Sequence, residues 1–288
     1  MATRASPMLA APPGPRVRSP VARFVQTVVA RAYPRVIGQQ RELTWIFFEI
    51  FLPMMAVAAY VFVYRAIGAP EEYVGFVVLG GAMTAFWMNV LWSMSSQLFW
   101  EKEQGNLALY IMAPNSLMAV LLGMALGGLF ATTLRAVVIL VAGSLLFEVH
   151  FAVGSLPALA ATFVLTMTAL YGLGMMSASL FLLLSREAWH LSNLAQEPVY
   201  LLSGFYFPIK SLNFWVAAAA SVIPLTLGLD AIRQLVSPSG AALGFLSVGT
   251  EIGILSVLCV VFLVAARSLL AHMERLAVRE GRLTESRR

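Results

Sequence analysis

The chain has 288 residues, of which 60% are hydrophobic and only 11% are charged, and its formal net charge is +5. So few charged residues cannot cover the surface of a water-soluble domain of this length, which excludes an ordinary soluble globular protein. The apolar residues come in long blocks, and this pattern predicts an all-α polytopic membrane protein.

The residue types also exclude several kinds of active site. Cys259 is the single cysteine, which excludes a disulfide within the chain and a cysteine-based zinc site. The three histidines are far apart in sequence, so we expect no metal site. Neither lysine follows a glycine, so the sequence contains no phosphate-binding loop of the G-x-x-x-x-G-K-[ST] type. We therefore expect no catalytic residues and no cofactor on this chain.

The first 44 residues predict a basic tail followed by an amphipathic helix. Residues 1–20 combine proline with arginine and predict a disordered tail. In residues 21–44, apolar side chains recur at helical spacing and arginines fall between them. We expect this helix to lie on the membrane surface, with its arginines toward anionic headgroups, and to bend or restart at Pro34. The alternative is a helix that packs on a soluble partner.

Six hydrophobic blocks follow and predict a transmembrane domain over residues 45–268. Each block is near or above the about 20 residues that cross the hydrocarbon layer as a helix. The fifth block is short and contains Glu197 and Pro198, so we expect it to be followed by re-entrant or interfacial helices in an outward segment, residues 205–241. The blocks cover residues 45–64, 74–98, 117–147, 156–184, 191–207 and 242–266.

The basic residues predict the orientation of the chain. Fifteen lysines and arginines flank the blocks on one side, and three flank them on the other. Because cytoplasmic flanks are enriched in basic residues, we expect both termini, including a basic tail at 269–288, to lie in the cytoplasm. We therefore expect a multi-pass protein of the cytoplasmic (inner) membrane. The same count explains the net charge by topology, so we expect no nucleic-acid partner.

Four ionisable residues fall inside the predicted spans. Burying such a group costs at least about 2.5 kcal/mol, so each one indicates a partner or a path for water. Arg135 and Glu251 come at comparable depths in the outer half of their spans, and we expect them to form a pair. Glu49 and Glu197 lie a few residues inside the cytoplasmic boundary, where they either reach water along the membrane surface or line a pathway.

Residues 99–116 form the one substantial cytoplasmic loop between the predicted spans. Charges cluster at its start, Gly105 favours a turn, and apolar residues follow until Pro114 stops any helix. This pattern predicts a short amphipathic helix below the membrane. Composition alone leaves two readings open: the helix docks in a groove of a partner protein, or it rests on lipid.

Two motifs in this chain resemble those of type-2 ATP-binding-cassette (ABC) exporter permeases. The run E-K-E-Q-G-N-L at 101–107, with a later proline, resembles the coupling helix of that family. The segment S-G-F-Y-F-P at 203–208, followed by I-P-L-T at 223–226, resembles the block between its fifth and sixth spans. The resemblance implies ATPase-coupling residues Glu101, Lys102, Glu103, Gly105, Leu107 and Pro114. It also implies an outward gate that contains Gly204, Phe205, Phe207, Pro208, Pro224 and Arg233.

The resemblance further implies a non-catalytic permease that works as a homodimer, or as a heterodimer with a related chain, embedded in membrane lipid. Two copies of a cytoplasmic ABC ATPase would bind ATP and Mg²⁺ and drive it, and we expect Glu101 and Glu103 to contact basic residues of that ATPase. The outer loops are mostly short, which favours a drug-like or lipid-like amphipathic substrate over a polysaccharide. The alternative function is a proton-coupled secondary transporter that uses Glu49, Glu197 and Glu251 as a relay.

Overall fold

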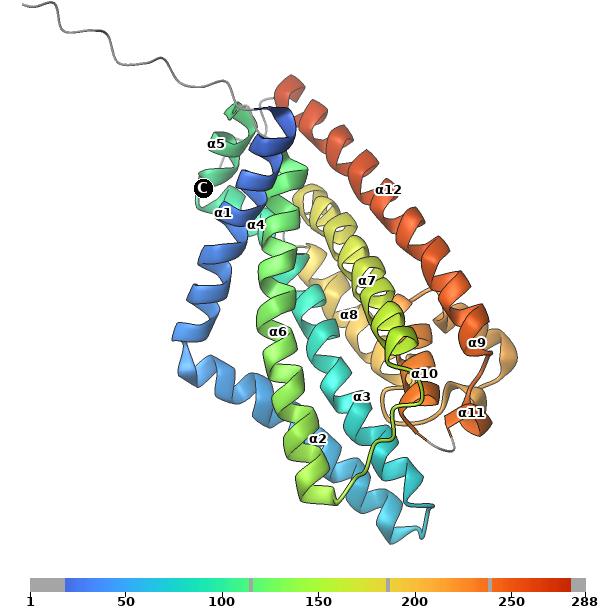
Figure 1. Cartoon of the computed structure of the whole chain (residues 1–288). Helices are drawn as coiled ribbons and strands as arrows, with labels where there is room; N and C mark the ends of the chain where they lie inside the picture. Colours follow the sequence, from blue (N-terminus) through green and yellow to red (C-terminus); the bar gives the residue numbers. More distant parts are fainter. Residues whose placement is uncertain (1–18, 114–115, 185–186, 238–239, 281–288) are drawn as a thin grey trace, which may run out of the picture.

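The computed structural model describes residues 19–113, 116–184, 187–237 and 240–280 (Figure 1). These residues form helices and turns without any β-strand, which confirms the all-α membrane fold. The helices are α1 (Pro20–Arg41), α2 (Leu43–Ala66), α3 (Glu72–Met88), the π-helical turn η1 (Asn89–Met94), α4 (Gln97–Glu103), α5 (Asn106–Met112), α6 (Leu117–Phe147), α7 (Leu156–Leu184), α8 (Glu187–Leu202), the 3-10 turn η2 (Ile209–Ser211), α9 (Phe214–Ala220), α10 (Pro224–Val236), α11 (Gly240–Leu243) and α12 (Val248–Glu280).

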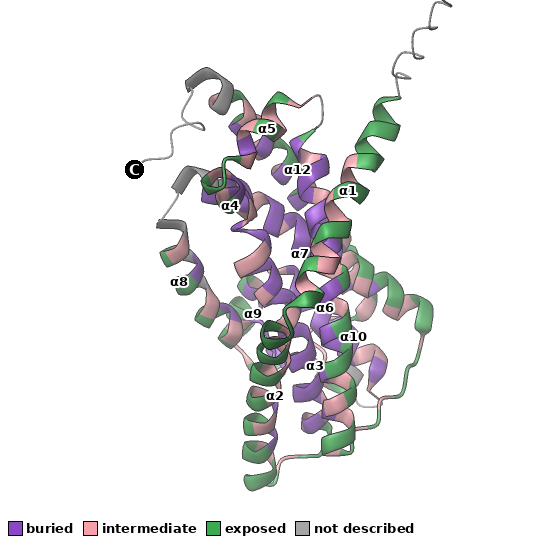
Figure 2. Ribbon diagram, turned by 90° about the vertical axis from the view of Figure 1, so that its left-hand side faces the viewer, coloured by how far each residue is buried: buried purple, intermediate pink, exposed green. Residues whose placement is uncertain are grey.

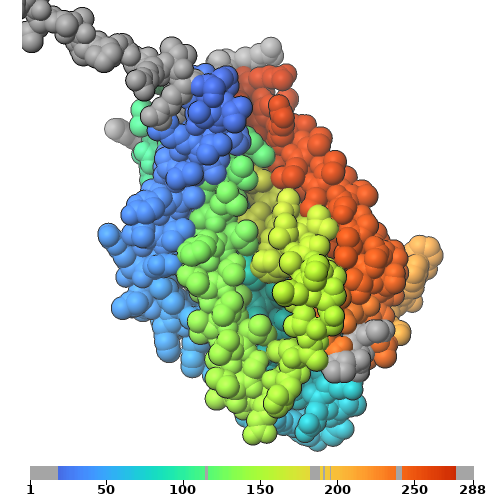
Figure 3. All heavy atoms as spheres, in the orientation of Figure 1, coloured from blue at the N-terminus to red at the C-terminus, as the bar shows by residue number. Residues whose placement is uncertain are grey.

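Within the described ranges, five helical segments are long and apolar enough to cross a membrane. They correspond to five of the six predicted spans, and the second of them runs without a sharp bend through α3, η1 and α4. In that segment, 89% of the most apolar window is buried, compared with 11% in α2. The α3 helix is therefore the most buried helix of the bundle (Figure 2). Helices α2, α6 and α10 pack against it, and α12 lies beside α7 (Figure 3).

The fifth predicted span, residues 191–207, differs from the structure. Helix α8 has 16 residues, so it is about 24 Å long and is not among the five candidate spans. It gives way to a turn at Gly204, whose φ of 70° lies in the left-handed region that glycine adopts without strain. Beyond this turn, α9 and α10 form a pair bent by 107°, which agrees with the predicted re-entrant or interfacial helices.

Helix α1 packs lengthwise on α6 (Figure 1). Ser19 caps its first turn by accepting a hydrogen bond from the Ala22 amide, and Pro20 occupies the first helical position. Of the two outcomes predicted at Pro34, a restart of the helix is wrong, because α1 continues through this proline and the chain turns at Glu42. A proline late in a helix is tolerated where neighbouring helices support the backbone.

Two glycines of α6 permit the close contact with α1. A Cβ atom built on Gly123 would lie 2.4 Å from the Val28 carbonyl oxygen, and one on Gly127 would lie 2.8 Å from the Ala32 carbonyl oxygen. Both distances are shorter than any ordinary contact, so only glycine allows this approach. The G-x-x-x-G pair of α6 therefore serves packing within the chain.

The start of α1 and the end of α12 lie at the same end of the bundle as α4 and α5 (Figure 1). Helix α12 continues to Glu280, so the first part of the predicted C-terminal tail is helical. The rest of that tail and most of the predicted N-terminal tail lie outside the described residues. At the opposite end of the bundle are the α2–α3 turn and the α6–α7 connection.

Candidate functional site

The loop predicted to couple to an ATPase forms two helices of seven residues each, α4 and α5. Gly105 joins them with a φ of 76°, in the left-handed region, and no atom lies within 4 Å of a Cβ built there. The turn therefore needs glycine for its backbone conformation and not for space. The predicted turn at Gly105 is confirmed, but the segment predicted to form one helix forms two. Pro114 lies outside the described residues.

Glu101 lies inside this segment. Its side chain is only 7% exposed, and it accepts hydrogen bonds from the Tyr110 hydroxyl at 2.8 Å and from Gln97 Nε2 at 3.2 Å. Burial, together with the hydrogen bond to Glu101 and the charge of Glu101, raises the pKa of Tyr110 to about 12, so this hydroxyl remains a donor at neutral pH. This burial leaves little of Glu101 accessible to a partner protein. Glu101 instead fastens α4 to α5.

The exposed surface of α4 and α5 is formed by other residues. Glu103 and Gly105 are exposed, and Leu109 and Met112 of α5 are 64% and 82% exposed. Of the other predicted coupling residues, Lys102 is half-buried and Leu107 is buried in the core. We call the exposed set of Glu103, Gly105, Leu109 and Met112 the coupling surface. It combines a carboxylate with two large apolar side chains.

We call α4 and α5 together the coupling segment. Two arginines of α1 attach this helix to it. The Arg31 guanidinium lies 4.1 Å from the centre of the Tyr110 ring. Arg35 donates hydrogen bonds to Gln97 of α4 and to Ser93 of η1. The prediction that these two arginines face lipid headgroups is wrong, because the lengthwise packing of α1 on α6 directs them into the bundle.

The predicted pair of Arg135 and Glu251 is also wrong. Arg135 of α6 forms an ion pair with Glu49 of α2. The physical reason is the position of α1, which runs beside the first turns of α6 before the chain turns at Glu42. Helix α2 consequently starts part of the way along α6 (Figure 1). The ion pair shows that this start brings Glu49 level with Arg135. Glu49 is thus half-buried and paired.

Glu251 finds its partners on α10. Gln234 donates from Nε2 to a carboxylate oxygen of Glu251 and to one of Asp230, both at 3.2 Å, and to the Leu246 carbonyl at 2.8 Å. Asp230 also accepts a hydrogen bond of 2.8 Å from the Phe245 amide. These contacts tie α10 to the start of α12. Glu197 of α8, the fourth predicted charge, is exposed and lies far along the chain from this cluster.

Arg233 holds the outward segment against α3. Its guanidinium donates to the carbonyl oxygens of Gly204, Phe205 and Phe76 and lies 3.2 Å from the centre of the Phe76 ring. A Cβ built on Gly80 of α3 would lie 1.6 Å from the Phe205 carbonyl oxygen, so the two backbones are in direct contact. The structure therefore brings together three of the predicted outward-gate residues, Gly204, Phe205 and Arg233.

The other three predicted outward-gate residues have local roles. Pro208 precedes η2, and Pro224 starts α10 at its first helical position. Phe207, directly before Pro208, is half-buried. Sequence reasoning placed Tyr110 in the coupling segment but missed its contacts with Glu101 and Arg31, and it missed that Arg31 and Arg35 attach α1 to this segment. The four-residue spacing of the two arginines, which places both on one helix face, was the available signal.

Comparison with known proteins identifies the family of this chain. The family described as ABC-2 type transporter matches residues 24–236. A protein named "Probable multidrug ABC transporter permease YbhR" from Escherichia coli strain K12 is 27% identical over 135 residues, which are 47% of this chain and 36% of that protein. The protein of the same name from Escherichia coli O157:H7 matches to the same extent. The chain thus spans about a third of the length of the curated relatives that it matches. Because the family match covers most of the chain, this protein belongs to the ABC-2 type transporter family of membrane permeases.

Proposed function

We propose that this chain is the permease subunit of an ATP-driven exporter that moves amphipathic molecules out across the cytoplasmic membrane. A separate ABC ATPase, present in two copies, binds ATP and Mg²⁺ and supplies the energy. Two permease chains, identical or related, form the pathway, and both termini are cytoplasmic. The family membership and the multidrug permease among the relatives support this function.

The observation that carries the proposal is the construction of the coupling segment. The Glu101–Tyr110 hydrogen bond fixes α4 against α5, and Arg31 supports Tyr110 from α1. The coupling surface on the other side is exposed and mixes a carboxylate with apolar side chains. Such a surface suits a groove of a partner that offers both a basic residue and an apolar floor. We propose that Glu103, and not Glu101, meets a basic residue of the ATPase.

Movement of this segment has two routes into the bundle. Helix α4 continues into α3 through the π-helical turn η1, within one segment of 32 residues. Arg35 connects Gln97 and Ser93 of the same segment to α1. A displacement of α4 and α5 by the ATPase is thus passed to α3 and to α1 together. This arrangement supports alternating access driven by ATPase closure.

The alternative, a proton-coupled secondary transporter, has less support. Its relay needs the carboxylates of Glu49, Glu197 and Glu251, but Glu49 is already paired with Arg135. Glu251 accepts a hydrogen bond from Gln234 of α10, and Glu197 is an exposed residue of α8. Because Glu49 and Glu251 have separate partners and Glu197 is exposed, these carboxylates do not form a chain of hydrogen bonds, and we prefer the exporter.

The test is purification of the tagged full chain from its native membrane in mild detergent, with identification of bound proteins and an assay of ATP hydrolysis. We expect an ABC ATPase to co-purify and to be lost from a variant that combines Glu103→Lys with Leu109→Ser. A matched control combines Glu42→Lys with Leu43→Ser, two exposed positions outside the coupling surface, and should retain the ATPase. Solute movement driven by a proton gradient, in a chain that purifies without an ATPase, would instead establish the alternative.

A further inference from the structure

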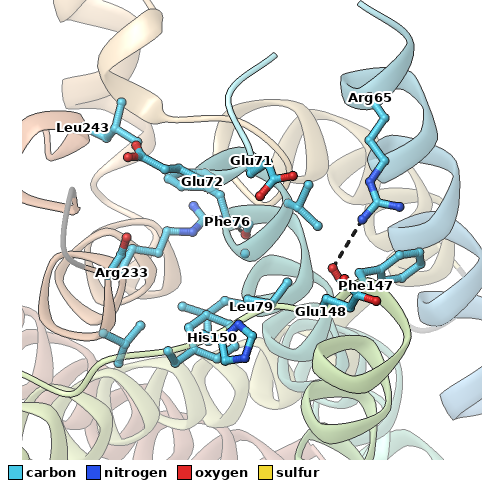
Figure 4. A pocket seen from close by; sticks show the side chains of 16 residues that line it. Arg65, Glu71, Glu72, Phe76, Leu79, Phe147, Glu148, His150, Arg233 and Leu243 are labelled. Atoms are coloured by element: carbon cyan, nitrogen blue, oxygen red, sulfur yellow. Dashed lines mark hydrogen bonds between the residues drawn. The ribbon is translucent and has the colours of Figure 1, made fainter. Parts of the chain in front are cut away.

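A cavity of about 290 Å³ lies beside Arg233, at the end of the bundle opposite the coupling segment (Figure 4). Its walls come from the α2–α3 turn, the start of α3, the α6–α7 connection and α10. Phe76, Leu79 and Phe151 give it an apolar and partly aromatic lining. The volume is close to the about 300 Å³ at which small-molecule pockets begin. The cavity therefore has the size and lining of a site for a compact organic ligand.

The rim of the cavity is acidic. Glu71, Glu72 and Glu148 line it, and all three are exposed. Within the described parts of the chain, none of these carboxylates has an ion-pair partner. Arg65 is the exposed cation of the rim, and it donates a hydrogen bond of 3.3 Å to the Phe147 carbonyl. Three carboxylates against one exposed guanidinium leave the entrance negative, so it attracts cations.

Arg233 also lines the cavity, but its positive charge lies in a buried wall and not at the entrance. The side chain is only 4% exposed, and its guanidinium is held by three backbone carbonyls and by the Phe76 ring. Its Nε–H is nevertheless buried without a hydrogen-bond partner. Because this Nε atom has almost no accessible surface, a ligand in the cavity does not reach it. The contacts open to a ligand are therefore those with the apolar lining and with the rim.

The arrangement of the carboxylates decides the kind of cation. Among the described residues, no group of three histidine, cysteine, aspartate or glutamate side chains is close enough to hold a metal ion. The negative charge is therefore spread around the rim and does not converge on a point. A spread negative potential above an aromatic lining matches an organic cation with a delocalised or shielded charge and an apolar body.

We propose that this cavity binds amphipathic organic cations of the quaternary ammonium or pyridinium type. The cation lies among the rim carboxylates, and the apolar body contacts Phe76 and Phe151. The role of the cavity as an exit subsite for the transported substrate rests on the proposed function. The binding itself does not depend on an ATPase.

The test uses berberine, a fluorescent isoquinolinium cation with ether oxygens, and the purified full chain in nanodiscs of zwitterionic phosphatidylcholine. We expect saturable binding, and we expect the Glu71→Gln/Glu148→Gln variant to bind roughly tenfold more weakly, because two nearby charges are lost. The Glu42→Gln/Glu274→Gln variant has the same change in net charge away from the cavity and should bind as the wild type does. Added salt should weaken binding to the wild type more than to the Glu71→Gln/Glu148→Gln variant.

A second variant fills the cavity and keeps every charge. Gly75 lines the cavity, and a Cβ built there would lie 3.1 Å from a methyl group of Val149, so Gly75→Leu places a side chain in the space that the ligand needs. We expect this variant to lose berberine binding. The proposal is overturned by absent or non-saturable binding to the wild type, by unchanged binding in both cavity variants, or by an equal loss in the Glu42→Gln/Glu274→Gln control. Since no ATPase is present, these outcomes leave the exporter proposal untouched.

Discussion

The carboxylate of Glu49 on α2 forms an ion pair with the guanidinium of Arg135 on α6, and these two side chains are 30% and 6% exposed. The pair joins the first helix after the α1–α2 break to the long helix on which α1 packs. Because Arg135 is the more deeply buried member, its charge depends on Glu49 for compensation. Loss of Glu49 therefore leaves an unpaired cation inside the bundle.

We expect Glu49→Gln and Arg135→Gln each to lower the free energy of unfolding, and Glu49→Gln to do so by about 3 kcal/mol. The exchange of the two residues, Glu49→Arg with Arg135→Glu, should recover part of this loss because the pair is kept with reversed polarity. Unfolding of the purified protein in a denaturing-detergent titration measures the differences. If Arg135→Glu were rescued by Glu251→Arg and not by Glu49→Arg, the ion pair described here would be incorrect.

The contact of Gly80 with the Phe205 carbonyl gives a second prediction. A Cβ at Gly80 would lie 1.6 Å from that oxygen and 2.7 Å from a guanidinium nitrogen of Arg233, and the carbonyl belongs to backbone that cannot rotate away. Gly80→Ala should therefore displace the outward segment from α3 and destabilise the protein by about 3 kcal/mol. Faster hydrogen exchange of the amides of residues 203–207 reports the displacement directly.

Gly253 of α12 is the matched control for Gly80→Ala. No atom lies within 4 Å of a Cβ built at this position. Alanine favours a helix over glycine by about 1 kcal/mol, so Gly253→Ala should leave the unfolding temperature unchanged or raise it. An equal loss of stability in both variants would mean that the effect comes from the loss of glycine in general and not from the contact with Phe205.

The hydrophobic blocks were sufficient to predict five of the spans, because burial in lipid imposes length and apolarity on each helix separately. The partners of the intramembrane charges were not predictable in the same way. From the sequence, the depth of a residue in the membrane can be counted only from the end of its hydrophobic block. This count predicts that Glu49 lies near the membrane surface. The position of α1 along α6 shifts the start of α2, and that packing depends on Gly123 and Gly127, which a hydropathy pattern does not distinguish from other small residues. A block of apolar residues thus predicts a helix but not its register against another helix.

The coupling segment shows the same limit on a smaller scale. Its acidic pair, Glu101 and Glu103, lies on α4, and two residues separated by one position present their side chains on different faces of a helix. Glu101 turns inward to Tyr110, and Glu103 turns outward. The motif predicted the segment, and only the helix geometry separated the structural carboxylate from the exposed one.

This difference predicts opposite effects for two conservative substitutions. Tyr110→Phe removes the hydroxyl that donates to the buried Glu101 carboxylate and should destabilise the permease by about 2 kcal/mol. Glu103→Gln changes an exposed side chain and should alter stability by no more than about 0.5 kcal/mol. Under the proposed function, however, Glu103→Gln should weaken association with the ATPase. Unfolding of the permease alone and binding of the ATPase to it separate the two effects, and a stability loss in Glu103→Gln without a change in binding would contradict the assignment.

Substitutions at Gly105 test whether the turn between α4 and α5 needs a left-handed backbone conformation. Its φ is 76° and a Cβ there meets no atom within 4 Å, so any effect of Gly105→Ala comes from strain in the left-handed region, which costs about 1 to 2 kcal/mol. Asparagine adopts this conformation more readily than alanine. Under the proposed function, Gly105→Asn should therefore retain more of the ATP hydrolysis that the permease would stimulate in a partner ATPase. We expect stimulated hydrolysis to decrease in the order glycine, asparagine, alanine. Equal activity of the alanine and asparagine variants would show that the turn is not required in this conformation, because the two side chains differ in their tolerance of positive φ and both have open space at this position.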